Sequence, residues 1–512
     1  MAESARSLAS TLLLFLLICS FLLTLSSSRI LTQQSTDYTA VLDVDDSLAR
    51  TAAVLSFDPT KTVLIDETEA KSISGGPANF SKLTIKLHSR DFLPHAAGGG
   101  SHKDYRSLTL ARLRRDSTRA EAISTRVSLA INDVKKSDLK PMSTDNSLAA
   151  MAAAGGVGAF SGPVISGAGQ GSGEYFSQIG VGQPASPAYL VIDTGSDVTW
   201  IQCQPCSDCY QQSNPLFDPS SSLTYSRLSC DSQQCRSLDV SACRNSSCLY
   251  QVSYGDGSFT VGEFATETFT FGSSPPVHSI AIGCGHDNEG LFVGSSGLLG
   301  LGGGPLSFPS QIRSPSFSYC LVDRDSPSSS TIEFGAGSYD PSFVTAPLLR
   351  NRKIDTFYYV GLTGISVGGE ALSIPPSLFV MDESGAGGVI VDTGTAVTRL
   401  KRDAYSALKE AFTKGTTDLP PAAGVALFDT CYDLSSRTTV QVPTVALRFA
   451  GGKELKLPAK NYLIPVDSAG TFCFAFAPTS SPLSIIGNVQ QQGTRVAFDL
   501  DNAVVGFSPN KC

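Results

Sequence analysis

The sequence predicts an all-β protein whose two halves are related copies of one lobe. From Glu174 onward, short apolar runs alternate with turn residues about every ten positions, a pattern typical of β-strands. The composition agrees with this prediction, because 41% of the residues are hydrophobic and only 16% are charged, with 47 Gly and 28 Pro. The 512 residues are enough for two or more units that each bury a core.

A repeated motif predicts the two lobes. The stretches LVIDTGSDVTW (190–200) and VIVDTGTAVTRL (389–400) are each an apolar strand that ends in Asp-Thr-Gly. A single Asp-Thr-Gly is most simply a turn at the end of a strand. Here each copy is followed by a second shared feature, an apolar pair and a glycine, at 298–300 and 485–487. We therefore expect a duplicated lobe in which each copy delivers one carboxylate to a shared site.

The first residues predict entry into the secretory pathway. Residues 1–28 are typical of a signal peptide, with Arg6 as the positive region and an apolar run over 12–25. An uncleaved anchor is the alternative, but about 14 apolar residues are short for a membrane span. We expect no stable span and a location in the endoplasmic reticulum, the vacuole or the extracellular space. The sequons at Asn79 and Asn245 predict glycosylation.

Residues 29–159 are predicted to form a propeptide. The run KLTIKL (82–87) alternates as an edge strand does, and 105–127 is helix-forming and basic. Residues 80–127 hold ten Lys and Arg against four Asp and Glu, whereas residues 160–512 carry a net charge of −10. A solvated charge run is the simpler interpretation. Our hypothesis is that the basic segment is held electrostatically against the acidic body.

The same hypothesis names basic side chains that would close the protein's own site. Arg112, Arg114 and Arg115 are the candidates to cover an acidic cleft at neutral pH. Acidification would protonate the carboxylates and loosen this pairing. The Ala-, Gly- and Ser-rich residues 148–172 predict a flexible, cleavable linker between the propeptide and the body.

Cysteine usage also indicates a secreted protein. Of 13 Cys, Cys19 lies in the leader, and the other twelve can form six disulfides. Seven of them fall in residues 203–248, which are predicted to be a loop insertion held by disulfides in place of a core. Cys203, Cys206 and Cys209 could form a metal cluster, but no His follows at zinc-site spacing. We expect disulfides and no metal.

Other motifs support or exclude classes of function. Tyr254, Gly255 and Asp256 begin a turn between two alternating strands, which predicts a β-hairpin. The glycines of GLLGLG (297–302) are assigned to close strand packing, because no Lys-Ser/Thr pair of a phosphate loop follows. His286 is interpreted as a loop residue rather than a catalytic base. An acidic body without a basic motif predicts no nucleic-acid partner.

Together, YLVIDTGSDV, YGDGSFTVGE, GCGHDNEGLF, GLLGLGGG, VDTGTAVTRL and SIIGNVQQQGTR resemble the motifs of pepsin-type aspartic endopeptidases, and the cysteine-rich insertion resembles that of their plant nepenthesin-like branch. The resemblance runs from the propeptide to Cys512. It implies a bilobal pepsin-like aspartic protease fold, with lobes related by a pseudo-twofold axis around a central cleft. The lobes would be 160–345, containing the insertion 203–248, and 346–512. It also implies a monomer without a cofactor, protein or peptide substrates, and the propeptide as inhibitor.

The resemblance assigns catalysis to Asp193 and Asp392. Two carboxylates that face one another share a proton, because two adjacent charges are unfavourable. The ionised member takes a proton from a water molecule that attacks the scissile carbonyl, and the neutral member donates to the oxyanion. Because the two titrations belong to the pair, we expect a bell-shaped acid profile of activity.

The resemblance also implies supporting roles around this pair. The residues it names are Gly195 and Gly394 for close approach of the loops, Thr194 and Thr393 for hydrogen bonds across the axis, Ser196 and Thr395 for bonds to the outer carboxylate oxygens, and Tyr254, Gly255 and Asp256 for the flap. Trp200, the single Trp of the chain, either supports the flap tyrosine or anchors the core.

The resemblance further implies four disulfides. These are Cys320–Cys512, Cys431–Cys473 and the nested pairs Cys230–Cys248 and Cys235–Cys243. Cys203, Cys206, Cys209 and Cys284 would form the remaining two, and spacing alone does not fix the connectivity.

An inactive protein of the same fold is the main alternative. Some plant proteins that resemble this fold bind or inhibit foreign glycosidases and have lost an Asp, a Gly or the flap tyrosine. This chain keeps both Asp-Thr-Gly motifs and Tyr254, so we expect an active enzyme. A retroviral-type dimer is excluded because both motifs lie in one chain. A serine hydrolase is disfavoured because none of the five His lies in a nucleophile motif.

Overall fold

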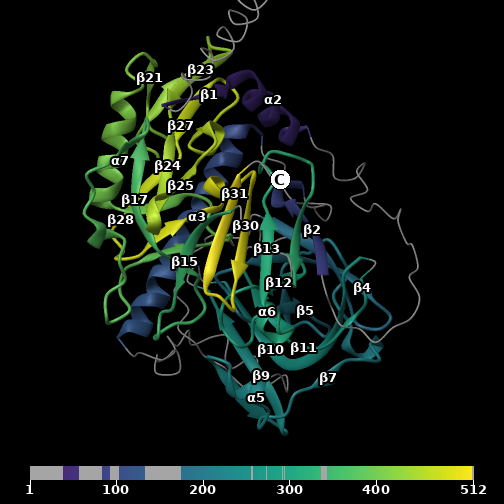
Figure 1. The fold of residues 1–512 in the computed structure, drawn as a ribbon. Coiled ribbons are helices and arrows are strands. Elements are labelled where there is room, and N and C mark those ends of the chain that lie inside the picture. The colour runs from purple at the N-terminus through teal and green to yellow at the C-terminus, as the bar shows by residue number, and fades with distance from the viewer. Residues whose placement is uncertain are drawn as a thin grey trace, which may run out of the picture.

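The computed structural model describes residues 38–56, 83–92, 103–132, 175–254, 258–272, 274–290, 292, 294–335, 343–509 and 512. The predicted signal peptide, the linker 148–172, the sequon at Asn79 and the flap residues Gly255 and Asp256 lie outside these ranges. In Figure 1 the first half of the body, in teal, lies below the second half, in green and yellow.

The first Asp-Thr-Gly motif lies at the end of a buried strand. Strand β4 (Ser186–Asp193) runs parallel to β12 (Gly297–Gly300), which pairs antiparallel with β5 (Trp200–Gln202). The long strands β10 (Phe259–Thr270) and β11 (Val277–Glu289) form an antiparallel pair beside β5. The other elements of this half are β3 (Tyr175–Val181), β6 (Asp208–Cys209), η3 (Pro219–Ser221), β7 (Ser226–Arg227), α5 (Gln233–Arg236), β8 (Ser241–Arg244), β9 (Ser247–Ser253) and α6 (Phe308–Gln311).

The second half repeats this arrangement around the second motif. Strand β19 (Val389–Val391) runs parallel to β29 (Ser484–Ile486), and β29 pairs antiparallel with β20 (Thr398–Lys401). Strand β28 (Phe476–Thr479) then runs parallel to β20, as β11 does to β5. The two apolar-apolar-Gly runs, β12 and β29, therefore occupy matching places. This confirms the prediction of a bilobal all-β fold.

A shared sheet joins the two halves. Its strands pair in the order β14, β13, β30, β31, β15, β16 and β19, so strands from both halves are neighbours. The new strands are β13 (Ser316–Cys320), β14 (Ser330–Phe334), β15 (Val344–Leu349), β16 (Tyr359–Val360), β30 (Thr494–Asp499) and β31 (Val504–Pro509). The predicted boundary between residues 345 and 346 falls within β15.

Two small sheets and one amphipathic helix complete the second half. Helix α7 (Arg402–Lys414) buries Leu408 and Phe412 against the strands. The remaining elements are β17 (Leu362–Val367), β18 (Glu370–Ala371), η4 (Pro376–Leu378), β21 (Pro421–Ala422), β22 (Cys431–Asp433), β23 (Thr439–Pro443), β24 (Val445–Phe449), η5 (Ala450–Gly452), β25 (Lys453–Lys456), η6 (Ala459–Asn461), β26 (Leu463–Pro465), β27 (Thr471–Phe474) and α8 (Asn488–Gln491).

Two strands of the predicted propeptide pair with strands of the body. Strand β1 (Thr39–Asp43) pairs with β23 and leads into α2 (Val44–Leu55). Strand β2 (Leu83–Ser89) pairs with β14 along its first five residues and with β3 at its last two, so it is not the free edge strand that we predicted. After η1 (Arg90–Phe92), helix α3 (Tyr105–Ile131) contacts residues of both halves.

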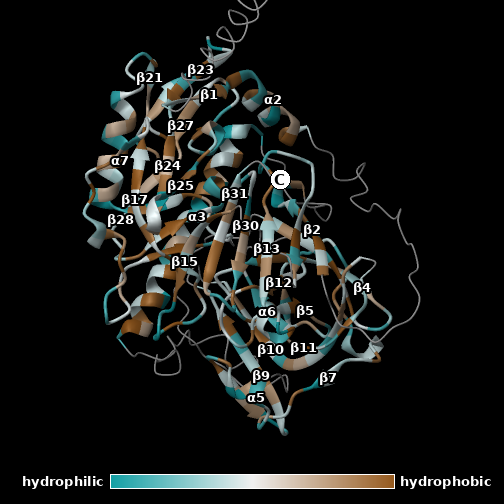
Figure 2. Cartoon of the chain, in the orientation of Figure 1, coloured by the Kyte–Doolittle hydropathy of each residue, from teal (hydrophilic) through white to brown (hydrophobic). Residues whose placement is uncertain are grey.

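The hydrophobic core includes strand β2 of the predicted propeptide. Figure 2 shows hydrophobic residues concentrated along the strands of both halves. Leu83, Ile85 and Leu87 of β2 belong to the same buried cluster as Phe317 of β13 and Phe498 of β30, whose rings stack 4.7 Å apart. Burying one such side chain stabilises the fold by about 2 kcal/mol. Strand β2 therefore contributes to the stability of the folded body.

The described cysteines form six disulfides, and two of the four predicted pairs are among them. Cys320 bonds Cys512, and Cys431 bonds Cys473, as the resemblance implied. The last four cysteines of that prediction pair as Cys203–Cys284 and Cys206–Cys209.

The nested pairing inside the cysteine-rich insertion was wrong. The structure joins Cys230 to Cys243 and Cys235 to Cys248. Cys230 donates its backbone N–H to the carbonyl of Ser246, which places it at the turn of the β8–β9 hairpin beside Cys243. Helix α5 then brings Cys235 back over β9, where the two buried cysteines meet in one apolar cluster. The pairing follows a hairpin register that spacing alone does not reveal.

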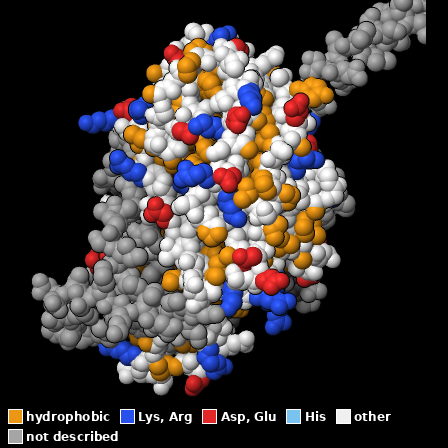
Figure 3. All heavy atoms as spheres, turned by 90° about the vertical axis from the view of Figure 1, so that its left-hand side faces the viewer, with side chains coloured by type: hydrophobic (Ala, Val, Ile, Leu, Met, Phe, Trp, Pro, Cys, Tyr) orange, Lys and Arg blue, Asp and Glu red, His pale blue; other side chains and the backbone are white. Residues whose placement is uncertain are grey.

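The surface is mixed in charge. Figure 3 shows acidic and basic side chains interspersed over the face drawn there, with hydrophobic side chains between them. Within the described ranges, no helix combines the length and the apolar character that crossing a bilayer requires. Asn245 is exposed on the β8–β9 turn, where a glycan would have room.

Candidate active site

The two Asp-Thr-Gly loops meet and are bonded to one another. The N–H of Thr194 donates to Oγ1 of Thr393 (3.2 Å), and the N–H of Thr393 donates to Oγ1 of Thr194 (3.0 Å). This reciprocal pair holds Asp193 and Asp392 side by side at the ends of β4 and β19. The structure thus brings together the two carboxylates that the repeated motif predicted would share a site.

Glycine allows this approach. A Cβ atom on Gly195 would lie 2.9 Å from Oδ1 of Asp392, and one on Gly394 would lie 2.9 Å from Oδ1 of Asp193. The guanidinium of Arg119 would lie as close or closer to both added atoms. A side chain at either position would therefore displace the opposite carboxylate, Arg119 or both.

Hydroxyl groups fix the orientation of each carboxylate. Oγ of Ser196 donates to Oδ2 of Asp193 (2.5 Å), and Oγ1 of Thr395 donates to Oδ2 of Asp392 (2.6 Å). The N–H of Gly195 also donates to Oδ1 of Asp193 (2.9 Å). These bonds lie at the positions that the resemblance implied.

Further polar side chains brace the second loop, and the sequence analysis missed them. Nδ2 of Asn488 donates to the carbonyl of Thr393 (2.9 Å). Nε2 of Gln491 donates to the carbonyl of Asp392 (3.3 Å), and Gln491 accepts from the buried hydroxyl of Tyr319 (2.6 Å). The signal for these residues was the NVQQQ run directly after the second apolar-apolar-Gly element.

The predicted flap tyrosine lies at the end of β9 beside the single tryptophan. Nε1 of Trp200 donates to the hydroxyl of Tyr254 (2.8 Å), and the ring of Phe292 packs against both side chains. Trp200 is fully buried in an apolar cluster. Its two proposed roles, core anchor and support of Tyr254, are therefore compatible in one position.

Helix α3 places an arginine directly on the two aspartates. Nη2 of Arg119 bonds Oδ1 of Asp193 (2.5 Å) and Oδ1 of Asp392 (3.2 Å), and Nη1 bonds Oδ2 of Asp193 (2.9 Å). Burial alone would lower the pKa of Arg119, but the two carboxylates outweigh it and hold this pKa above its ordinary value. Asp193 is 0% exposed and Asp392 is 1% exposed beneath the helix.

The arginines that we predicted would cover the acidic site do not contact the two aspartates in the interactions described. Arg112 bonds Asp91 of the propeptide (2.5 Å) and Asp325 of the body (2.8 Å), and Arg114 is exposed. Arg115 is buried, and its charge acts on Asp91. The register of the helix decides which arginine reaches the aspartates, and that register was not visible in a run of six arginines. The usable signal was the spacing of Arg112, Arg115, Arg119 and Arg126, which places them on one helical face.

A second arginine of α3 contacts the loop after the first aspartate. Nη2 of Arg126 lies 3.8 Å from Oδ2 of Asp197 and donates to Oγ1 of Thr356 (2.8 Å). Asp197 also accepts from Thr356 (2.5 Å) and from the N–H of Gly304 (2.9 Å). Burial raises the pKa of Asp197, and the nearby Arg126 opposes part of this rise.

An aspartate of α3 contacts β20 and the two residues before it, which follow the second Asp-Thr-Gly motif. Oδ1 of Asp116 accepts from the N–H groups of Ala396 (2.6 Å) and Val397 (3.0 Å). Its Oδ2 accepts from Nη1 of Arg399 (2.5 Å). Both Asp116 and Arg399 were absent from our predicted site residues, because their pairing spans 283 positions of the chain.

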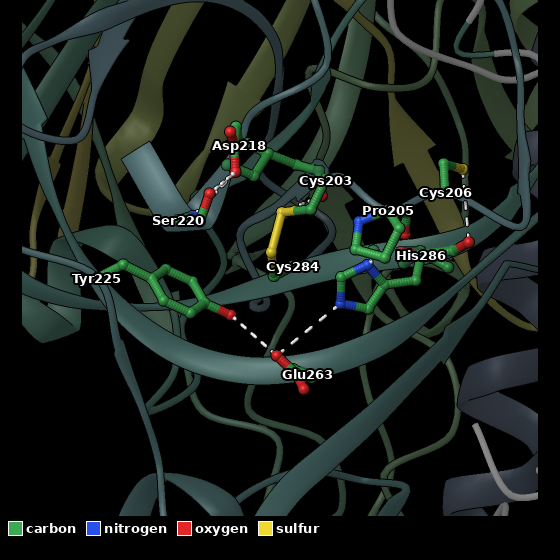
Figure 4. The surroundings of a disulfide bond; sticks show 12 residues. Cys203, Pro205, Cys206, Asp218, Ser220, Tyr225, Glu263, Cys284 and His286 are labelled. Atoms are coloured by element: carbon green, nitrogen blue, oxygen red, sulfur yellow. Dashed lines mark hydrogen bonds and ion pairs between the residues drawn. A yellow bond between two sulfur atoms is a disulfide. The ribbon is translucent and has the colours of Figure 1, made fainter. Parts of the chain in front are cut away.

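His286 has a structural place in the first half. It lies in strand β11, not in a loop as we predicted, and Nδ1 contacts the carbonyl of Pro205 (2.9 Å). Figure 4 shows its other nitrogen directed at Glu263, close to the Cys203–Cys284 disulfide. The interaction with His286, whose Nε2 lies 3.9 Å from Oε2 of Glu263, is the main reason that the pKa of Glu263 lies below its ordinary value.

Nothing in the described part of the chain is arranged as a metal centre. Over these residues, no three His, Cys, Asp or Glu side chains come together as ligands. The chemistry available at the site is that of two adjacent carboxylates, each oriented by a hydroxyl group, with a cation now between them.

Comparison with known proteins places this geometry in context. The family described as "Xylanase inhibitor N-terminal" matches residues 175–336, and "Xylanase inhibitor C-terminal" matches residues 357–509. Aspartyl protease family protein 2 of Arabidopsis thaliana is 49% identical over 471 residues, covering 90% of this chain and 92% of that protein. Protein ASPARTIC PROTEASE IN GUARD CELL 2 of the same plant is 46% identical and covers 84% and 88%. Aspartic proteinase nepenthesin-2 of Nepenthes gracilis is 43% identical and covers 67% and 78%.

Solved structures show the same architecture. The crystal structure of edgp superposes with a TM-score of 0.56 at 23% identity and covers 65% of this chain and 91% of that chain. Conglutin gamma, a basic 7S globulin from lupine seeds, superposes with a TM-score of 0.52 at 22% identity and covers 66% and 92%. At these identities the similarity shows the fold alone.

Proposed function

The chain belongs to the plant pepsin-like family of aspartic proteases and is an aspartic-type endopeptidase, and we propose that Asp193 and Asp392 are its catalytic pair. The observation that carries the proposal is the shared guanidinium. One nitrogen of Arg119 bonds an oxygen of each aspartate, so the two carboxylates face the same small volume. A water molecule in that volume could bond to both.

The mechanism follows from this placement. After α3 leaves, the facing carboxylates share one proton, because two charges so close together are unfavourable. The ionised carboxylate removes a proton from the bound water as it attacks the scissile carbonyl, and the protonated carboxylate donates to the carbonyl oxygen. When the tetrahedral intermediate collapses, the C–N bond breaks, the pair protonates the leaving amine, and the other product is a carboxylic acid. The bonds from Ser196 and Thr395 keep the outer oxygens in place, so the inner oxygens remain available for the reaction. Tyr254, with Gly255 and Asp256, would close over the substrate.

We further propose that the chain is made as a zymogen whose propeptide is the inhibitor. Three contacts support this: Arg119 on the catalytic pair, Arg126 beside Asp197, and Asp116 on Arg399. Acidification would weaken the pairs whose carboxylates take up protons, so activity would appear on the acid side of neutrality.

An inactive inhibitor is not favoured, although the matching families carry the name of xylanase inhibitors. The relatives of 41 to 49% identity are called aspartyl or aspartic proteases. Both glycines of the motifs lie against the opposite aspartate, and both hydroxyl residues donate to the aspartate of their own motif.

Several finer expectations belong to the same proposal. The site is assembled from one chain, which supports a monomer as the active unit. Six disulfides support folding in the secretory pathway, with glycans at Asn245 and Asn79. Residues 1–28 would be the signal peptide and 29–159 the propeptide, followed by lobes at 160–345 and 346–512.

The test is peptide cleavage by the processed protein from about pH 2 to about pH 8, with and without a statine-type transition-state mimic. Wild type, Asp193→Asn and Asp392→Asn are compared. We expect cleavage on the acid side, blocked by the mimic and lowered at least about a thousandfold in each variant. Activity that survives in either variant would remove that aspartate from the mechanism. A folded wild type that cleaves nothing would favour the inhibitor instead.

A further inference from the structure

The strand after the second catalytic motif holds a carboxylate with three donors. Two consecutive backbone N–H groups, from Ala396 and Val397, bond one oxygen of Asp116 at 2.6 and 3.0 Å. The guanidinium of Arg399 bonds the other oxygen at 2.5 Å. Such charge-assisted bonds are among the strongest that a carboxylate accepts in a protein.

This donor set is buried and rigid. The Asp116 side chain is 0% exposed, and the Arg399 side chain is 9% exposed. Arg399 lies in β20 between β28 and β29, and its Nη1 also donates to the carbonyl of Val397 (3.2 Å). The donors therefore belong to the body and are held by its sheet, whereas the carboxylate belongs to the propeptide.

Loss of the propeptide removes the carboxylate and leaves the donors. Both terminal nitrogens of Arg399 point at α3, because Nη2 lies 3.2 Å from the hydroxyl of Ser117. A partly buried cation and two N–H groups without their anion are unfavourable, so the site favours a new carboxylate in the same place.

We propose that Arg399 and the N–H groups of Ala396 and Val397 form a carboxylate-binding subsite of the mature enzyme. It selects protein substrates that carry Asp or Glu at one fixed position near the scissile bond. This inference rests on the proposed function, because it takes the cleft vacated by α3 as the substrate site.

The propeptide also indicates how near the cleavage point the subsite lies. Asp116 precedes Arg119 by three residues, which is about 4.5 Å along a helix. An extended substrate rises about 3.3 Å per residue, so the acidic side chain lies within about three residues of the scissile bond. One turn earlier, Leu113 belongs to the same buried apolar cluster as Ala396, Val397 and Val489, so an apolar side chain is expected beside the acidic one.

The experiment uses the processed enzyme and pairs of peptides that differ only in Glu or Gln at one position. The pair is moved along the three residues on each side of the scissile bond. At about pH 5.5, where a substrate Glu is ionised, we expect kcat/KM to favour Glu about ten- to hundredfold at one position. Arg399→Gln should bring this ratio close to one. Arg402→Gln removes the same charge from an exposed site on α7 and should keep the wild-type ratio.

A pH arm and a conservative variant separate charge recognition from loss of folding. At about pH 3 the substrate Glu is mostly protonated, so the wild-type ratio should shrink toward one. Arg399→Lys keeps a charge but not the fork of the guanidinium, and should retain a reduced preference for Glu. These two measurements decide the matter even if Arg399→Gln does not fold.

The outcomes distinguish this inference from the proposed function. Equal cleavage of Glu and Gln peptides at every position, or a preference that persists in Arg399→Gln, would overturn the subsite and leave the catalytic pair intact. Wild type that cleaves no peptide, or cleavage undiminished in Asp193→Asn, would overturn the proposed function itself.

Discussion

The two Asp-Thr-Gly loops share a backbone arrangement but differ in the charges that follow it, an acid (Asp197) after the first and a cation (Arg399) after the second. Each aspartate is followed by a threonine that bonds the other loop and by a hydroxyl that bonds its own carboxylate. Beyond these residues the first loop carries Asp197, and the second continues to Arg399. The two aspartates and the residues that orient them are thus arranged symmetrically. The charged residues that contact α3, Asp197 and Arg399, differ between the two loops.

Helix α3 contacts both the symmetric pair of aspartates and the differing charges beyond it. Arg119 bonds both aspartates and so meets the symmetric centre. On either side, Asp116 meets the cation of the second loop and Arg126 meets the acid of the first. The helix therefore fits the cleft in only one direction.

The largest effect is expected from breaking the symmetric contact. Arg119→Met in the full-length chain removes the cation from both aspartates, and loss of one partner of a buried charged pair weakens such contacts by about 2 to 5 kcal/mol. We expect the latency of the proform at about pH 6 to fall by about thirty- to a thousandfold or more, measured as the initial rate on a small peptide. Arg114→Met, at an exposed position of the same helix, is the control. Equal latency in both variants would contradict the role of Arg119.

Next come the two asymmetric contacts, which should differ in strength. Asp116→Asn weakens three short bonds in a buried place, and we expect acid activation of the full-length chain to be about ten- to a hundredfold faster. Arg126 is 27% exposed and lies 3.8 Å from Asp197, so Arg126→Gln should change this rate by no more than about fivefold. Activation rates after a step to acidic pH measure both. Similar changes in the two variants would mean that the outer charges do not distinguish the loops.

Acidification should release the two ends of α3 at different pH values. Burial would raise the pKa of Asp91, but Arg112 outweighs it and holds this pKa at about 2, so the stabilisation persists until the pH falls through about 2. The pKa of Asp197 is raised by burial, so it takes up a proton, and loses its attraction for Arg126, at a higher pH than an ordinary Asp.

Hydrogen exchange of the full-length chain at about pH 4 tests this order. Amides around Arg126 should exchange before those around Arg112, and Asp197→Asn should remove the pH dependence of the early step. Exchange that begins around Arg112 would contradict the assignment.

The smallest effect tests the symmetry itself. Ser196→Ala and Thr395→Ala each remove one hydroxyl bond to a carboxylate of the proposed pair. We expect each substitution to lower kcat by about five- to tenfold. Thr363→Ala removes an exposed hydroxyl of β17 and should leave kcat unchanged. Clearly unequal losses in the first two variants would show that the loops are not equivalent in the reaction.

The sequence revealed the symmetric part of this site and not the asymmetric part. The motifs around Asp193 and Asp392 repeat, so their pairing and the strands β12 and β29 could be predicted from pattern alone. The contacts of Asp116 with Arg399, and of Arg126 with Asp197, join segments far apart in the chain and depend on how α3 is rotated. The propeptide helix was predicted, but with Arg112, Arg114 and Arg115 in the place of Arg119.

The disulfides show the same limit. Cys320–Cys512 and Cys431–Cys473 could be transferred from the resemblance, whereas the crossed pairs Cys230–Cys243 and Cys235–Cys248 depend on the β8–β9 register. The spacing of the cysteines does not predict which face of the β8–β9 hairpin helix α5 covers.

Strand β2 would keep the predicted propeptide attached to the body after a cut in the chain that follows α3. A cut anywhere between α3 and β3 breaks one covalent bond but none of the seven residue pairings that join β2 to β14 and β3. After such a cut, α3, the proposed inhibitory helix, would still be tethered to the body through β2, whose Leu83, Ile85 and Leu87 lie in the core. Under the proposed zymogen, a nicked chain would therefore keep α3 close enough to rebind the site until β2 also leaves the sheet.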